Sequence, residues 1–277
     1  MGGIHRCIEG ALTGVAYADL TALGAKTITH LIVPDGMTCL DELRITMSQL
    51  IQTDQKGGLL AVRLSGGALV HSPYEFFVCG FTNGTAVTSG GHVQHMEPFV
   101  KKCGLIVRPG QPLVVEGCVA SGSDPGTTEV AIEAKWAASG GTKKYSFARY
   151  GSEAALDTET AMDLTAESVA ATDILFPSDV SECIGVVMAV GGICLATATG
   201  GGSHYRFKSG FSKGPFVLGG PAWSSLATNP GICSGIIESV DIPMHKAISK
   251  NALCEITAEQ NGVDWGTVYL GVSVEVQ

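Results

Sequence analysis

The sequence predicts an all-β protein made of two tandem β-sandwich repeats of about eight strands each, and three observations support this prediction. The chain repeats its own pattern at an interval of about 144 residues. Its clearest segments alternate apolar and polar residues with a period of two, which is typical of half-buried strands. Short turns containing glycine separate them, and 37 of the 277 residues are glycine. Such spacing favours a sandwich over βαβ units, which need long helical stretches between strands.

The duplication is visible at both ends of the repeat. Residues 11–12 (AL) and 19–22 (DLTA) recur as 155–156 and 163–166, at a constant offset of 144. Towards the end of the repeat the offset is 140, where Leu113, Gly122, Asp124, Gly126 and Thr127 match Leu253, Gly262, Asp264, Gly266 and Thr267. The order is preserved while the offset drifts, as surface loops of different length would produce. We predict repeat 1 at 1–137, a linker at 138–149 and repeat 2 at 150–277.

The strands of repeat 1 are expected at 27–33, 42–51, 59–64, 75–80, 92–100, 104–108, 113–120 and 127–136. The last strand of each repeat alternates most clearly, with Val130, Ile132, Ala134 and Trp136 in one copy and Val268, Leu270, Val272, Val274 and Val276 in the other. We expect these residues to face a core and the residues between them to face water. The only helical candidates are the alanine-rich 10–24 and 152–168, and extended arms remain an alternative because glycine interrupts the first.

A charge-free run at 184–203 has the length of a membrane span, but six of its twenty residues are glycine. We interpret it as two buried strands joined by a Gly-Gly turn. Its counterpart in repeat 1 carries Asp41, Glu42 and Arg44, so we expect no membrane span.

Charged residues make up only 16% of the chain, where an ordinary soluble domain has about 25%. The net charge of −9 disfavours a nucleic-acid surface, since phosphate binding needs clustered Lys and Arg and the only adjacent basic pairs are 101–102 and 143–144. A surface so poor in charge suits burial against copies of the same chain.

The first ten residues lack the basic segment followed by an apolar segment that defines a signal peptide. We therefore do not expect export, and we expect copies of the chain to associate in the cytoplasm of the cell that makes them. The nine cysteines include no CxxC pair. We expect reduced and mostly buried thiols.

One motif resembles a catalytic one. Residues 210–214 (GFSKG) match the G-x-S-x-G pattern of a nucleophile elbow, which needs a strand before the serine and a helix after it. Here residues 215–218 (PFVL) predict another strand, so we do not expect hydrolase chemistry at Ser212.

Four further features have simpler explanations than a site. His92 and His95 lie three apart, which on a strand places them on opposite faces and makes a shared zinc ion awkward. The stretch 150–205 holds eight carboxylates without a Lys or Arg before Arg206, but it lacks a calcium-loop motif, so we expect a solvated or docked acidic face. Asn83-Gly84-Thr85 and the matched Asp124 and Asp264 read as turn residues. We therefore predict no catalytic, cofactor-binding or metal-binding residues and no cofactor.

Two similar eight-strand sandwiches in one chain, without a catalytic constellation, resemble the tandem or double jelly-roll organisation of viral structural proteins. The resemblance implies a subunit of a major capsid that assembles with copies of itself into a virion shell. It carries over no individual residue. The alternative is a tandem β-sandwich that binds carbohydrate or a receptor through exposed aromatic residues. Trp136 is expected in a core, which leaves Trp223 and Trp265 for that role. An immunoglobulin-like strand order is also still open.

Overall fold

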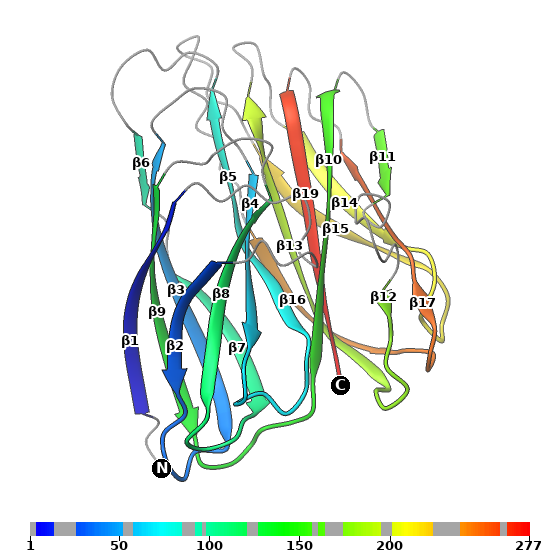
Figure 1. The fold of residues 1–277 in the computed structure, drawn as a ribbon. Helices are drawn as coiled ribbons and strands as arrows, with labels where there is room; N and C mark the ends of the chain where they lie inside the picture. The colour runs from blue at the N-terminus through cyan, green and yellow to red at the C-terminus, as the bar shows by residue number, and fades with distance from the viewer. Residues whose placement is uncertain are drawn as a thin grey trace.

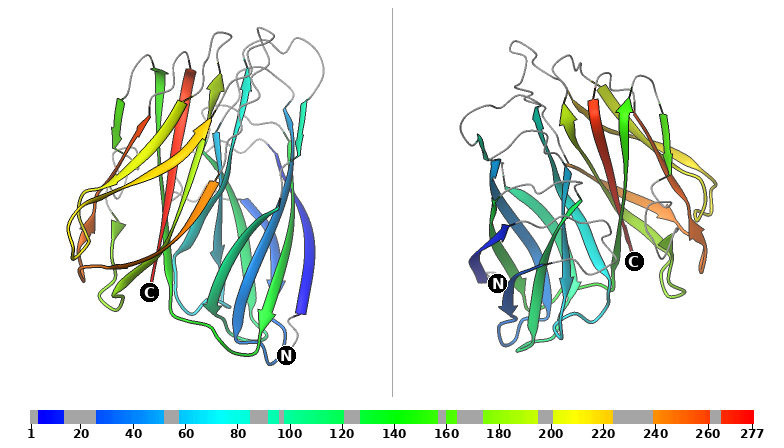
Figure 2. Two further views of the ribbon diagram at one scale, coloured as in Figure 1. Left: turned by 180° about the vertical axis from the view of Figure 1, so that it is seen from behind. Right: turned by 45° about the horizontal axis from the view of Figure 1, so that its top comes forward.

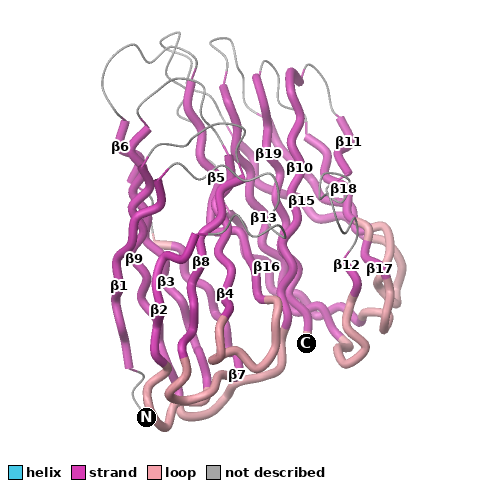
Figure 3. Tube along the Cα trace, in the orientation of Figure 1, coloured by secondary structure: helices cyan, strands magenta, loops and turns pink. Residues whose placement is uncertain are grey.

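The computed structural model describes residues 4–13, 26–51, 58–84, 92–95, 98–120, 127–156, 160–163, 174–194, 201–223, 239–260 and 265–277. Within these ranges all regular secondary structure consists of β-strands, which confirms the all-β class (Figure 3). In the same ranges no helix is long and apolar enough to cross a membrane.

Repeat 1 contributes β1 (Ile4–Thr13), β2 (Lys26–Ile32), β3 (Cys39–Ile51), β4 (Gly58–Ser65), β5 (Tyr74–Gly84), β6 (His92–His95), β7 (Phe99–Ile106), β8 (Pro112–Ala120) and β9 (Thr127–Ala137). Repeat 2 contributes β10 (Tyr145–Leu156), β11 (Thr160–Asp163), β12 (Ile174–Leu175), β13 (Glu182–Cys194), β14 (Gly201–Phe207), β15 (Phe216–Trp223), β16 (Ser239–Ala247), β17 (Leu253–Cys254), β18 (Ile256–Gln260) and β19 (Trp265–Val276). The eight strands expected in repeat 1 are present, but the two expected at 92–100 and 104–108 are His92–His95 and Phe99–Ile106, and β1 is a further strand that was not expected.

The strand order of repeat 1 is that of a jelly roll. One sheet runs β1-β9-β3 with β6 and β7 both paired to β3, and the other runs β2-β8-β4-β5. The chain thus crosses from one sheet to the other at every connection except those from β4 to β5 and from β6 to β7, which is not the immunoglobulin order.

Repeat 2 has the same order, and the two jelly rolls stand side by side with their strands roughly upright (Figure 1). Its first sheet runs β10-β19-β13-β16. In its second sheet two strands are each divided in two, so that β11-β18-β14-β15 is continued by the short pair β12-β17. The prediction of two tandem jelly-roll-like sandwiches is confirmed.

Strand register allows the repeats to be aligned residue by residue. β3 and β13 both have 13 residues and both carry an irregularity near their start. One equivalence expected from sequence is wrong by a residue: Leu113 pairs with Leu31, and the corresponding pair in repeat 2 is Cys254 with Ile174. Cys254 is buried like Leu113, whereas Leu253 points outward.

The helical candidates are wrong wherever the structure describes them. Residues 10–13 belong to β1, which pairs with β9 along its whole length, and residues 152–156 and 160–163 are strands. These segments are rich in glycine and alanine, so they show no alternation of large apolar residues that would predict a strand. They are strands because they form hydrogen bonds with strands that are distant in the sequence. The rest of 10–24 and 152–168 lies outside the described residues. Within the proposed linker, residues 145–149 already belong to β10, and the domain boundaries stay a prediction.

Of the apolar run 184–203, residues 184–194 belong to β13 and residues 201–203 begin β14, but Gly191 and Gly192 lie inside β13 and not in a turn. β13 is apolar because both its faces are covered. Val186, Met188 and Val190 join the core of repeat 2, while Val187 and Ala189 join the core of repeat 1. The residue of β3 that corresponds to Val187 is Arg44, which is exposed.

The covered outer face of repeat 2 extends to β19, where Ser273 and Glu275 are 2% and 4% exposed. The expectation that the polar positions of this strand face water is therefore wrong. They face β4 and β5 of repeat 1, so closely that a Cβ atom on Gly271 would come within 2.8 Å of Leu59 Cδ1.

One strand ties the two jelly rolls together. β5 pairs in parallel with β10 at Tyr74 and Ser146, and with β13 at Thr82–Gly84. These pairings join the second sheet of repeat 1 to the first sheet of repeat 2, as the two views in Figure 2 show. We call the contact between the two jelly rolls the seam.

Candidate functional site

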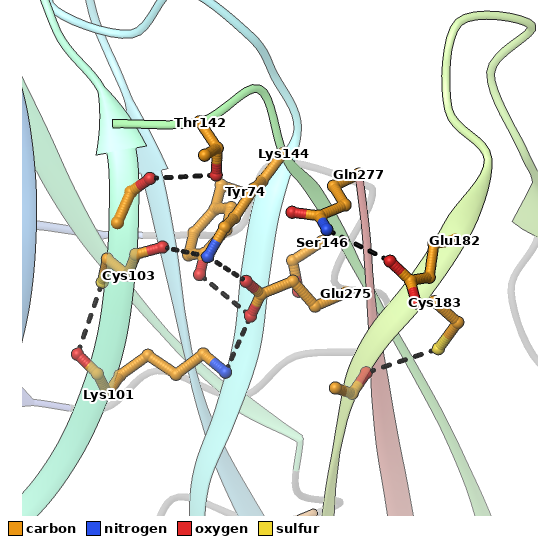
Figure 4. Close-up of polar contacts among 12 residues, drawn as sticks. Tyr74, Lys101, Cys103, Thr142, Lys144, Ser146, Glu182, Cys183, Glu275 and Gln277 are labelled. Carbon is orange, nitrogen blue, oxygen red and sulfur yellow. Dashed lines mark hydrogen bonds and ion pairs between the residues drawn. The ribbon is translucent and has the colours of Figure 1, made fainter. Parts of the chain in front are cut away.

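A buried carboxylate lies in the seam, beside the start of β5. Glu275, on the outward face of β19, is 2.8 Å from Lys101 Nζ through one oxygen and 3.2 Å from Lys144 Nζ through the other (Figure 4). The Tyr74 hydroxyl donates a hydrogen bond of 3.1 Å to the same carboxylate. Lys101 and Glu275 are almost fully buried, so the ammonium and the carboxylate satisfy each other out of contact with water.

Three separate parts of the fold supply these groups. Lys101 lies on β7, Tyr74 begins β5 and Lys144 immediately precedes β10. The connecting segment before β10 is itself bound to repeat 1, since the Thr142 amide donates to Gly104 O at 2.8 Å and Lys144 Nζ donates to Cys103 O at 2.8 Å. A buried ion pair of this kind requires one relative placement of its elements, because any shift would leave a charge unpaired.

Hydrogen bonds on either side extend the seam. The Phe77 amide donates to Ser273 Oγ at 3.3 Å, and the Ser146 hydroxyl donates to Glu75 O at 2.6 Å. Both bonds run from one jelly roll to the other. The seam thus combines these polar contacts with apolar packing, in which Val187 and Ala189 join the core of repeat 1.

The cysteines are structural. Cys39, Cys79, Cys103, Cys183 and Cys254 are free and buried, as expected from the sequence. Burial raises the pKa of the Cys79, Cys103 and Cys183 thiols to about 12, which keeps them protonated and unreactive. The side chains of Cys7, Cys118, Cys194 and Cys233 are not among those described.

Repeat 2 contains a pocket of about 440 Å³ between the start of β13, the turn before β15 and the end of β16. Glu182 Oε1 lies 3.0 Å from His245 Nδ1 on one side of it. On another side Lys246 Nζ sits 4.4 Å from the centre of the Phe216 ring, a cation–π contact. The exposed Lys213 completes the rim. The pocket therefore presents two ammonium groups and an aromatic ring.

The GFSKG motif forms one wall of this pocket, as a turn between β14 and β15. Phe211 packs into an aromatic cluster with Phe207 and Phe216, and the Ser212 amide donates to Ala247 O at 3.0 Å. Within the described chain no hydrogen bond joins the Ser212 hydroxyl to His245. A turn between two strands lacks the strand-to-helix geometry that a nucleophile elbow requires.

The remaining sequence features are placed as follows. Trp136 is fully buried, as expected. Asp179, from the acidic stretch, binds Lys143 and accepts a bond of 3.3 Å from the Tyr145 hydroxyl, so this carboxylate faces the connecting segment. Asn83 and Gly84 lie in β5 and not in a turn.

Other features are described only in part or not at all. His92 and His95 begin and end β6, and only their backbone is described, as is that of Trp223 and Trp265. Asp124 and Asp264 lie outside the described residues. Among described residues, no three His, Cys, Asp or Glu side chains meet at metal-binding distance.

No family model and no curated protein matches the chain. Solved structures with a similar path of the chain include the major capsid protein of bacteriophage PM2, at 8% identity and a TM-score of 0.35, with 98% of each chain covered. A chain of broad bean stain virus has 8% identity and a TM-score of 0.38, covering 100% of this chain and 89% of that one. A peptide-N(4)-(N-acetyl-β-D-glucosaminyl) asparagine amidase has 7% identity and a TM-score of 0.40, covering 98% and 96%. Both capsid components and an enzyme are thus represented.

Proposed function

We propose that the chain is a self-assembling structural subunit, the major capsid protein of a virus, in which the two jelly rolls form one rigid tile of the shell. The observation that carries the proposal is the seam: Glu275, Lys101 and Lys144 fix two upright jelly rolls in one relative placement. A shell subunit needs a body that keeps its shape under contact from many neighbours, and jelly rolls serve this role in viral capsids.

Exposed apolar residues at structurally equivalent positions support self-association. Leu175 and Leu253 pair across β12 and β17 and are 57% and 52% exposed, and Ile32, the counterpart of Leu175 in repeat 1, is 46% exposed. Contact with further copies would remove this apolar surface from water. The partners we propose are copies of this chain, and the location is the virion after assembly in the host cytoplasm.

The direct test is the mass of the purified protein. We expect large uniform particles or sheets by light scattering and negative-stain microscopy. A stable monomer of 28.6 kDa across a range of salt and pH would contradict the proposal. Clear hits of that monomer on a glycan array would favour the alternative of a carbohydrate- or receptor-binding protein.

A paired variant tests the apolar contact. Replacing Leu175 and Leu253 together by lysine should reduce particle formation and change the free energy of unfolding by only about 0.5 kcal/mol, because both side chains face water in the single chain. Replacing the exposed Lys250 by glutamate is the matched control and should leave assembly intact. Normal particles from the double lysine variant would exclude these leucines from the interface.

A further inference from the structure

The pocket of repeat 2 is the structural counterpart of the place in repeat 1 where the seam forms. Leu40 pairs with Leu105 in repeat 1, and the equivalent pair in repeat 2 is Cys183 with Lys246. In the same way, the pairs of Leu64 with Tyr74 and of Phe207 with Phe216 show that Tyr74 corresponds to Phe216. Lys246 and Phe216 of the pocket are therefore the structural equivalents of Leu105 and Tyr74.

In repeat 1 this position is filled by the next part of the chain. Thr142 forms a parallel bridge with Leu105, and a Cβ atom on Gly141 would lie 3.0 Å from the Ile106 backbone. The Glu275 carboxylate lies beside them, bound by two lysines and by Tyr74. A backbone segment and a carboxylate therefore cover the site completely.

In repeat 2 the same position is an open pocket, and basic residues line it. The buried Leu105 is replaced by Lys246, whose ammonium rests on Phe216, and Lys213 lines the same pocket. Within the described chain neither lysine has a carboxylate at ion-pair distance, whereas Glu182 contacts His245 and Gln277. The pocket thus brings two ammonium groups, without a carboxylate partner in the described chain, to the edge of an aromatic ring, at positions other than those of Lys101 and Lys144, which bind Glu275 at the seam.

We propose that this pocket binds a carboxylate group between Lys213 and Lys246, beside the Phe216 ring. The carboxylate belongs either to a small organic acid or to an acidic side chain of a second copy. In both cases it accepts charge-assisted hydrogen bonds from the two ammonium groups. The proposal holds for a single chain as well as for an assembled one, so it does not depend on the capsid proposal.

Lysine acetylation, followed by peptide mass spectrometry, tests the site in both states of the protein. In the dissociated chain, about 100 mM glutarate would saturate a site of millimolar affinity. We expect it to slow the acetylation of Lys213 and Lys246 by roughly threefold or more, because a bound carboxylate holds the ammonium groups charged. Glutaramide, and sodium chloride at equal ionic strength, should have no such effect. The exposed Lys208 and Lys250 are the internal controls.

A variant confirms the location. Lys246→Leu restores the residue found in repeat 1, so the fold should accept it, and glutarate should then no longer protect Lys213. Unchanged rates with glutarate in the dissociated chain, or equal slowing of all four lysines, would overturn the proposal. Protection in assembled particles without added acid would assign the carboxylate to a second copy. Protection only with glutarate would assign it to a small molecule.

Discussion

A few single residues determine how the two jelly rolls contact each other, and the roles of these residues could not be predicted from the sequence. Lys101 appeared only as half of a basic pair, and Glu275 occupied a position expected to face water. Each is buried because of the other, although they lie far apart in the chain. Alternation along a strand shows which residues share a face, but it does not show whether a second domain covers that face.

We predict that Glu275→Gln lowers the free energy of unfolding by about 3 kcal/mol, because it leaves Lys101 buried beside a neutral group. Chemical denaturation measures the change. The matched control is Asp41→Asn, which removes a partly exposed pair with Lys135 and should cost about 0.5 kcal/mol or less. Equal effects of the two variants would mean that the buried pair does not hold the seam.

The buried thiols predict a loss of stability at alkaline pH. Cys79, Cys103 and Cys183 have pKa values of about 12 in the fold against 9.0 in the unfolded chain. Above pH 9 the unfolded chain releases protons that the fold retains, so stability present below pH 9 is lost as the pH rises towards 12. Each thiol contributes up to about 1.4 kcal/mol per pH unit in this range.

Labelling measures the same property at neutral pH. Iodoacetamide at pH 8 should modify these three cysteines only after denaturation. Rapid labelling of any of them in the folded chain would show that its thiol is accessible.

At the level of elements, strands were predictable wherever large apolar residues alternate with polar ones, as in β9. β1 and β10 were not, because glycine and alanine give no such pattern and the strands depend on pairing with β9 and β19. The pocket was missed for a related reason: only register shows that Lys246 occupies the position of Leu105. The GFSKG motif was the one sequence feature that pointed to this region. It indicated a turn, but it did not indicate the lysines and the aromatic ring of the pocket.

The equivalent strands β3 and β13 allow a reciprocal exchange. Val187→Arg should lower the free energy of unfolding by about 3 kcal/mol or prevent folding, because it places a charge inside the seam. Arg44→Val, at the same position of repeat 1, should change it by less than about 1 kcal/mol, since Arg44 is exposed. Circular dichroism during urea unfolding gives both values. Similar costs for the two exchanges would contradict the assignment of β13 to a buried face.

For the whole molecule, the seam predicts that the two jelly rolls unfold together. The core of repeat 1 includes Val187, Ala189 and Tyr269 from repeat 2, so loss of one jelly roll exposes apolar surface of the other. Calorimetry of the dissociated subunit should show a single transition with equal calorimetric and van't Hoff enthalpies. Two resolved transitions would indicate that each jelly roll is stable without its neighbour.

The two attachments of β5 also have a mechanical consequence. Tyr74 meets β10 and Thr82 meets β13, and at ~3.3 Å per residue these anchors are about 26 Å apart along the strand. One anchor would act as a hinge, whereas two separated anchors resist rotation about any axis across the strand. Pressure on either half of the molecule should therefore be transmitted to the other half as displacement, with little bending between them.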